Sequence, residues 1–297
     1  MEPRNDYIRD FLGVTAWHRA GYTGKRGLTL TAEPLGTAGT HAAKTLAAFR
    51  EIAPERRVEY LRFTDSSTQA AEFCDRAEAS GADTMYMSLT SSSGSGGTEI
   101  LDALMPRRMT FFAAAGNDAG EAYNRRTEAE TIYAVGACTL KYSASVNGKP
   151  APGAKLILDT ADYTSVSEFV DFASITEFFV DGAYFDGTSC AAPVLCGMAA
   201  LVNEFFIERT GRPLRAEAMY RFFAEHCVDV ATPGKDTDTG YGVPVLPPPE
   251  FINLWDYQEE AKTVTVHQLV EAAKADSSKV PSTSTLKRLQ HWPKRNA

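Results

Sequence analysis

The sequence lacks a long hydrophobic run. No stretch of about 18 consecutive apolar residues, the length needed to span a bilayer, occurs in its 297 residues. Residues 1–6 are polar and acidic, where a secretory signal would begin to build an apolar core. We therefore expect no membrane span, no secretion signal and a cytoplasmic location.

Cysteine is scarce. The sequence has five cysteines, an odd number, and they are widely scattered and never form a Cys-x-x-Cys pair. This pattern excludes a disulfide framework and gives no zinc-ligand spacing. We expect reduced thiols, no metal and no cofactor.

Basic residues are outnumbered, with 30 Lys and Arg against 38 Asp and Glu and a net charge of −8. Residues 262–297 alone carry +5, which leaves −13 for the rest. Aromatic residues do not alternate with this basic tail beyond Trp292, so nucleic-acid binding is not expected. The triple proline at 247–249 predicts a boundary between a domain over residues 1–250 and a basic extension over 251–297.

Apolar, β-forming runs alternate with helical patterns, which predicts an α/β fold with a parallel sheet between helices. A helix over residues 6–20, with Asn5 as its N-cap, comes first. Strands are expected at 28–32, 58–63, 84–89, 109–115 and 131–137, and helices at 40–51, 68–80, 98–105, 189–209, 214–225 and 264–275.

Two segments could carry chemistry. Residues 185–193 place Ser189 between the turn-forming Gly187 and a helix start, where the helix dipole favours developing negative charge. Residues 113–118 place Asn117 after an apolar strand, and a side-chain amide there can donate to an oxyanion. Together they indicate a nucleophile and its electrostatic partner.

Both segments resemble those of the subtilisin-like serine peptidases, and weaker landmarks follow in that family's chain order. The resemblance covers residues 7–245 and implies a three-layer subtilisin-like fold that binds a peptide or protein segment in a cleft. It implies substrate contacts along Ser88, Leu89 and Thr90 and near Ala115 and Gly116. The further landmarks are residues 21–24, 39–43, 52–54, 135–137 and 240–242.

The departures from the family fall on its catalytic residues. Ala32 stands at the position of the family's aspartate and Ala38 at that of its catalytic histidine, and the segment between them is short. A serine hydroxyl needs a base, and the base needs an orienting group. We therefore predict an inactive relative, a pseudopeptidase that binds peptide or protein or serves as a structural unit.

The alternative is a weak or unusual serine endopeptidase that uses a substitute base. His41 lies one helical turn beyond Ala38, but the resemblance gives that position a structural histidine. Glu33 adjoins Ala32 and could act as a carboxylate base, as Glu does in sedolisin-like peptidases. Cys190 could serve as a thiol nucleophile, although a buried core role suits it better.

Overall fold

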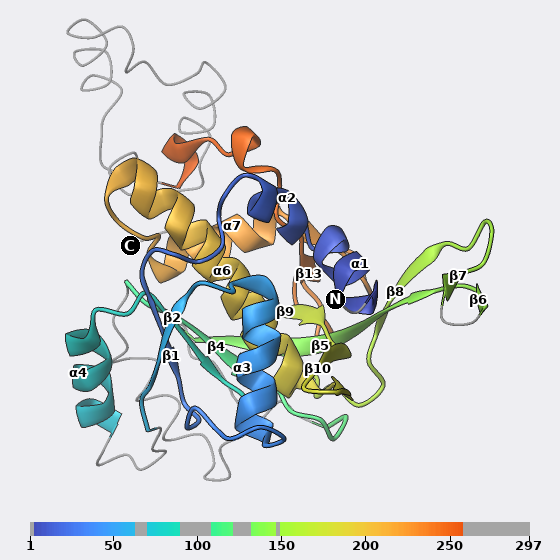
Figure 1. Ribbon diagram of the computed structural model, residues 1–297, viewed down its shortest axis with the longest axis horizontal. Helices are drawn as coiled ribbons and strands as arrows, with labels where there is room; N and C mark the ends of the chain where they lie inside the picture. Colours follow the sequence, from blue (N-terminus) through green and yellow to red (C-terminus); the bar gives the residue numbers. More distant parts are fainter. Residues whose placement is uncertain (1–2, 63–69, 90–107, 121–131, 147–148, 258–297) are drawn as a thin grey trace, which may run out of the picture. The chain divides into compact units, whose positions relative to one another are not determined.

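The computed structural model describes residues 3–62, 70–89, 108–120, 132–146 and 149–257 (Figure 1). Internal contacts divide the chain into two compact units, residues 1–250 and 251–297. The helices expected at 98–105 and 264–275 lie outside the described residues. The second unit is described only over residues 251–257, which include the short 3-10 helix η2 (Leu254–Asp256).

A seven-stranded sheet forms the centre of the first unit. Its strands run in the order β2-β1-β3-β4-β5-β8, and β9 also pairs with β5. All pairings are parallel except that of β5 with β8. The strands are β1 (Leu28–Thr31), β2 (Arg57–Tyr60), β3 (Thr84–Met87), β4 (Thr110–Ala114), β5 (Ile132–Tyr142), β8 (Leu156–Thr160) and β9 (Val170–Ile175).

Helices cover both faces of this sheet, which confirms the predicted α/β fold. Met85 and Met87 of β3 join one apolar cluster with Phe73 of α4 (Ala70–Ser80). Tyr86 points to the opposite face and stacks on Phe49 of α3 (His41–Ile52), with ring centroids 5.5 Å apart. Alternating side chains of a strand thus supply two cores. The helices α6 (Thr188–Thr210) and α7 (Ala216–Glu225) pack against strands of the sheet as well.

The remaining elements are short. Three two-stranded pairings supplement the sheet. They and the terminal elements are α1 (Pro3–Phe11), α2 (Val14–Arg19), β6 (Ser145–Val146), β7 (Lys149–Pro150), β10 (Phe178–Val180), β11 (Ala183–Phe185), β12 (Cys227–Val228), β13 (Val243–Pro244) and the 3-10 helix η1 (Pro249–Phe251).

The single helix expected over residues 6–20 is two helices. Gly13 interrupts it with φ of 77°, and a Cβ there would lie 2.1 Å from the carbonyl oxygen of Leu246. Glycine is therefore required by both the backbone angle and the close approach. Asn5 lies inside α1 and is not its N-cap, because its side chain bonds both backbone groups of Phe179 at 2.8 Å.

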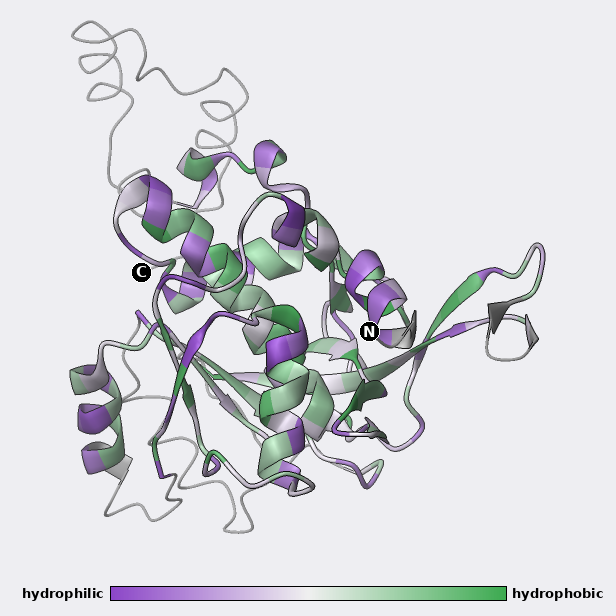
Figure 2. Cartoon of the chain, viewed as in Figure 1, coloured by the Kyte–Doolittle hydropathy of each residue, from purple (hydrophilic) through white to green (hydrophobic). Residues whose placement is uncertain are grey.

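Helix α6 is the central helix of the fold, and hydrophobic residues follow it along most of its length (Figure 2). Among the described residues it is the one helix long and apolar enough to cross a membrane, which the sequence analysis did not expect. Its apolar window is 94% buried within the protein. Burial of this extent is typical of a core helix.

Buried polar groups fix α6 to the sheet and to the N-terminal segment. Asn203 of α6 donates to Asp83 at 3.0 Å, and Asp83 also pairs with the fully buried Arg56. Burial raises the pKa of the Asp83 carboxyl, while Arg56 and Asn203 act in the opposite direction. The next residue, Glu204, accepts hydrogen bonds from three successive backbone N–H groups, of residues 23–25. The C-terminal half of α6 is thereby fixed to Asp83 and to the segment before β1.

Candidate active site

Ser189 lies in the first turn of α6, half-buried at its N-terminal end. Gly187 precedes the helix with φ 84° and ψ 166°, a conformation that is essentially restricted to glycine. A Cβ on Gly187 would lie 3.2 Å from Nδ2 of Asn117, so the turn also needs the missing side chain. The N–H groups of a first helical turn have no intrahelical acceptor, and the backbone of Ser189 can donate outward.

Asn117 follows β4 and is held rigidly. Its Oδ1 accepts from the backbone N of Thr188 at 2.8 Å and from the Thr188 hydroxyl at 3.0 Å. Because those donors fix which end of the amide is oxygen, Nδ2 is left as a free donor for the cavity. Asn117 Nδ2 and the Ser189 N–H together form the kind of donor pair that stabilises an oxyanion.

His41 is the first residue of α3, because Thr40 caps the helix by accepting from the backbone N of Ala43 at 3.2 Å. His41 Nδ1 and Glu33 Oε1 are 2.6 Å apart. The Glu33 side chain is only 7% exposed, whereas that of His41 is 46% exposed. The second carboxylate oxygen of Glu33 is buried without a hydrogen-bond partner among the described residues. Nδ1 is therefore committed to Glu33, and Nε2 is the nitrogen left for other chemistry.

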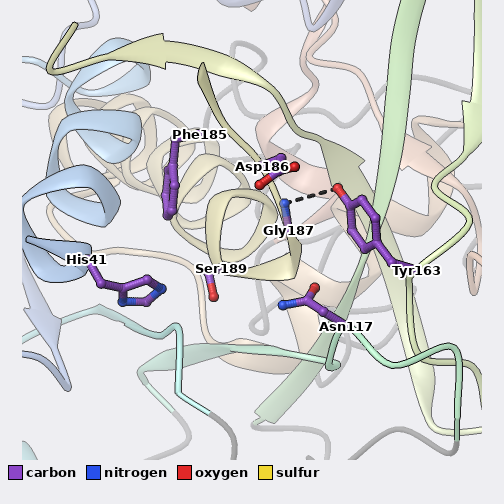
Figure 3. A pocket seen from close by; sticks show the side chains of 7 residues that line it. All are labelled: His41, Asn117, Tyr163, Phe185, Asp186, Gly187 and Ser189. Atoms are coloured by element: carbon purple, nitrogen blue, oxygen red, sulfur yellow. Dashed lines mark hydrogen bonds between the residues drawn. The ribbon is translucent and has the colours of Figure 1, made fainter. Parts of the chain in front are cut away.

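One cavity of about 320 Å³ brings these groups together. Ser189 lies between His41 and Asn117 in this cavity (Figure 3). The three residues come from separate segments of the chain. The Phe185 ring packs against the His41 ring edge to face, with centroids 5.7 Å apart. We call this space the Ser189 cavity; its lining residues are His41, Asn117, Tyr163, Phe185, Asp186, Gly187 and Ser189.

The Ser189 hydroxyl bonds to the end of β3 in this structure. Its Oγ donates to the carbonyl oxygen of Ser88 at 3.2 Å, and the Ser88 hydroxyl donates to the carbonyl oxygen of Ser189 at 2.9 Å. These two hydrogen bonds connect Ser88, the first residue after β3, to the start of α6. The hydroxyl hydrogen of Ser189 is thus directed to Ser88 and away from the imidazole.

Ala32 and Ala38, which the resemblance places at the family's catalytic positions, are not among the cavity-lining residues. Ala32 is buried directly after β1, and Ala38 lies in the exposed turn before α3. Cys190 is fully buried, and desolvation raises the pKa of its thiol to about 12. A thiol in that environment stays protonated, so Cys190 is unsuited to the nucleophile role.

The predicted substrate residues are spread more widely. Leu89 is exposed at the end of β3, whereas Ala115 is fully buried and its N–H donates to Val135. Both backbone groups of Gly116 are bonded, to Thr188 Oγ1 and to the N–H of Ser165. Thr90 lies outside the described residues. The predicted substrate contacts among these residues stay a prediction.

Three residues of the Ser189 cavity were missed. Phe185 and Asp186 belong to the Ser189 segment itself, where the sequence analysis assigned roles to other residues and none to these two. Tyr163 comes from an irregular stretch with no motif to signal it. Its hydroxyl accepts from the backbone N of Gly187 at 3.0 Å and supports the turn before the nucleophile. Burial raises the pKa of Tyr163 above its ordinary value.

The fold, with a serine at the start of α6 beside the Asn117 amide, is that of a subtilisin-like protein. A model of the subtilase family matches residues 35–242. The chain therefore belongs to the subtilase family. The match begins after Glu33, so the residue that bonds His41 lies outside the matched range. No curated protein matches the sequence.

Two solved structures have a similar fold. The crystal structure of a lanthipeptide protease is 15% identical with a TM-score of 0.59, and the match covers 82% of this chain and 93% of the other. The structure of the prenylagaramide maturation protease PagA is 18% identical with a TM-score of 0.55, over 85% of this chain and 99% of the other. At these identities the similarity establishes the fold alone. Among the described residues, no group of three or more His, Cys, Asp or Glu side chains could hold a metal ion.

Proposed function

We propose that this chain is a serine endopeptidase in which Ser189 is the nucleophile, His41 the base and Glu33 the group that orients the base. The 2.6 Å contact between Glu33 Oε1 and His41 Nδ1, at the edge of the Ser189 cavity, carries this proposal. A serine hydroxyl becomes an effective nucleophile only beside such an oriented base. His41 supplies the base and Glu33 supplies its orienting group, so the pair meets a requirement that neither residue meets alone.

The start of α3 explains why the residues differ from the family's usual positions. In the family this helix begins at the catalytic histidine, and in this chain it begins at His41. The connection from β1 to α3 spans only residues 32–40. A shorter connection brings a later residue to the helix start, and the longer side chain of Glu33 spans the distance from the strand end. His41 as the base and Glu33 as its orienting group would thus form one arrangement, displaced along the chain from the family's usual positions.

In the proposed reaction, Ser189 Oγ leaves Ser88 and turns to His41 Nε2. The hydroxyl attacks the scissile carbonyl carbon as its proton passes to Nε2, and Glu33 stabilises the imidazolium that forms. The C–N bond then breaks as His41 gives that proton to the leaving amine. Water, with His41 again as base, hydrolyses the acyl-enzyme. The departure of Ser189 Oγ from Ser88 begins with a rotation about the Ser189 Cα–Cβ bond.

Negative charge on the tetrahedral intermediate is stabilised by Asn117 and the Ser189 N–H. Thr188 holds the Asn117 amide in place, so this donor needs no reorganisation during the reaction. A preorganised donor of this type contributes about 2.7–4 kcal/mol to catalysis. The α6 N-terminus adds favourable dipole charge at the same point.

The second candidate is the pseudopeptidase. It is favoured by the bond from Ser189 Oγ to Ser88 and by Ala32 and Ala38 at the family's catalytic positions. On that hypothesis the cavity binds a peptide segment without cutting it, and the His41–Glu33 pair only stabilises the helix start.

Labelling with a fluorophosphonate probe separates the two candidates, because the probe reacts with activated serines. We expect the wild type to be labelled at Ser189, Ser189→Ala to be unlabelled, and His41→Ala to react at least about 10³-fold more slowly. Peptide cleavage should fall in parallel. His226→Ala is the matched control, since it removes an imidazole that bonds the Phe222 carbonyl outside the cavity. A folded wild-type protein that neither reacts nor cleaves would refute the peptidase and leave the pseudopeptidase.

A further inference from the structure

Among the described residues that line the Ser189 cavity, Asp186 is the one Asp, Glu, Lys or Arg. The other lining residues are aromatic, amide, hydroxyl or glycine, apart from the imidazole of His41, and none is Lys or Arg. Asp186 is exposed and forms no ion pair or side-chain hydrogen bond within the described part of the chain. A carboxylate beside a substrate cavity with no protein cation to neutralise it favours a cationic group of the ligand.

The walls beside this carboxylate are aromatic. Asp186 lies between Phe185 and Tyr163 in the cavity (Figure 3). Aromatic faces pack well against the aliphatic stems of long basic side chains, which keep their charged ends in water. A short cation such as an ammonium alone would leave these walls uncovered. The combination fits a lysine or arginine side chain.

The position of Asp186 indicates which half of the substrate carries that residue. The leaving amine takes its proton from His41, so the departing half of the substrate lies on the His41 side of Ser189. Phe185, the neighbour of Asp186, contacts the His41 ring directly. Phe185 therefore lies on the side of the departing half, and Asp186 continues this wall from Phe185 toward Tyr163.

Resting on the proposed function, we propose that the Ser189 cavity selects peptides with Lys or Arg on the leaving-group side of the scissile bond, and that Asp186 is the specificity-determining residue. The charge of the rest of the chain acts in the same direction. Outside residues 262–297 the chain carries −13, which attracts cationic peptides at low salt.

Two synthetic peptides test this proposal after cleavage sites have been mapped in a peptide library by mass spectrometry. They are identical except that one has lysine and the other norleucine, which keeps the aliphatic stem without the charge, at the first position after the scissile bond. We expect a kcat/KM ratio of about three to five in favour of lysine, the size of an exposed ion pair. Asp186→Asn should bring the ratio to about one, and Asp186→Lys should invert it.

Asp159→Asn is the matched control. It removes the same charge from an exposed position on β8, outside the cavity lining, and should leave the ratio unchanged. Raising the salt from 0.05 to about 0.5 M should reduce the wild-type ratio, because exposed charges are screened. Cleavage with a ratio of one in the wild type would overturn the role of Asp186 while leaving the peptidase intact. Absence of both cleavage and fluorophosphonate labelling would overturn the proposed function itself.

Discussion

Glu33→Gln tests the proposed charge relay with the smallest change in shape. Glutamine keeps the length of the side chain but loses the charge, and its amide can donate to His41 Nδ1. That bond favours the tautomer with hydrogen on Nε2, which cannot accept the serine proton. The charge-assisted hydrogen bond at 2.6 Å contributes about 1.5–3 kcal/mol, and the wrong tautomer adds to the loss. The corresponding change in a serine-protease triad lowers kcat about 10⁴-fold.

We expect Glu33→Gln to lower kcat about 10³- to 10⁴-fold, or about 4–5.5 kcal/mol in activation free energy. The assay is steady-state cleavage of a peptide mapped from the library, with fluorophosphonate labelling as a second measure of Ser189 reactivity. Thermal unfolding should be little affected, because glutamine keeps a hydrogen bond to His41 Nδ1 and removes the cost of burying a charged group.

Glu59→Gln is the control for charge. Glu59 lies on β2, is half-buried, pairs with Arg57 and is not among the cavity-lining residues, so its loss should change kcat less than twofold. A folded Glu33→Gln variant that keeps kcat within threefold of the wild type would refute the orienting role of Glu33. The reasoning from the 2.6 Å contact would then fail even if Ser189 is reactive.

Four further outcomes follow from the same contacts. Asn117→Ala should lower kcat about 10²- to 10³-fold, and a loss below threefold in steady-state kinetics would remove it from the oxyanion site. Gly187→Ala should destabilise the fold by about 1–3 kcal/mol in denaturant unfolding and slow probe labelling; an unchanged midpoint would contradict the strain at φ 84° and ψ 166°. Asp83→Ala should cost about 3–5 kcal/mol, because it leaves Arg56 buried without its partner, and stability within 1 kcal/mol would contradict this. Cys190 should resist alkylation in the folded protein at pH 8, where a thiol of pKa about 12 is ionised to roughly one part in ten thousand; rapid modification seen by mass spectrometry would show otherwise.

Local patterns determined much of the fold. The alternation of apolar runs and helical patterns predicted the central strands, and the structure confirms the α/β class. The long helix expected over 189–209 extends over Thr188–Thr210. Its continuous apolar character and the flanking Gly187 and Gly211 are sufficient to define it. Errors arose where distant segments meet. Gly13 divides the first helix at the point where the backbone of Leu246 approaches it. Local helix propensity carries no information about this distant contact.

The Ser189 and Asn117 segments could be found from sequence because each is a contiguous motif with its own chemistry. The proposed base could not. Family positions in the sequence lead to Ala32 and Ala38, whereas α3 begins at His41 and the carboxylate that bonds this histidine is that of Glu33. Two residues eight positions apart, at a strand end and a helix start, meet only when the connection between those elements has a definite path.

The sequence by itself determined the class of fold and singled out the Ser189 and Asn117 segments, since these depend on local backbone geometry and hydrophobic periodicity. The tertiary structure alone decided that Glu33 bonds His41 and that Asp186, Phe185 and Tyr163 line the same cavity. Such contacts depend on the packing of α3, α6 and the segments after β8 and β11 around one sheet edge. Packing in three dimensions brings together side chains whose separation along the chain carries no signal.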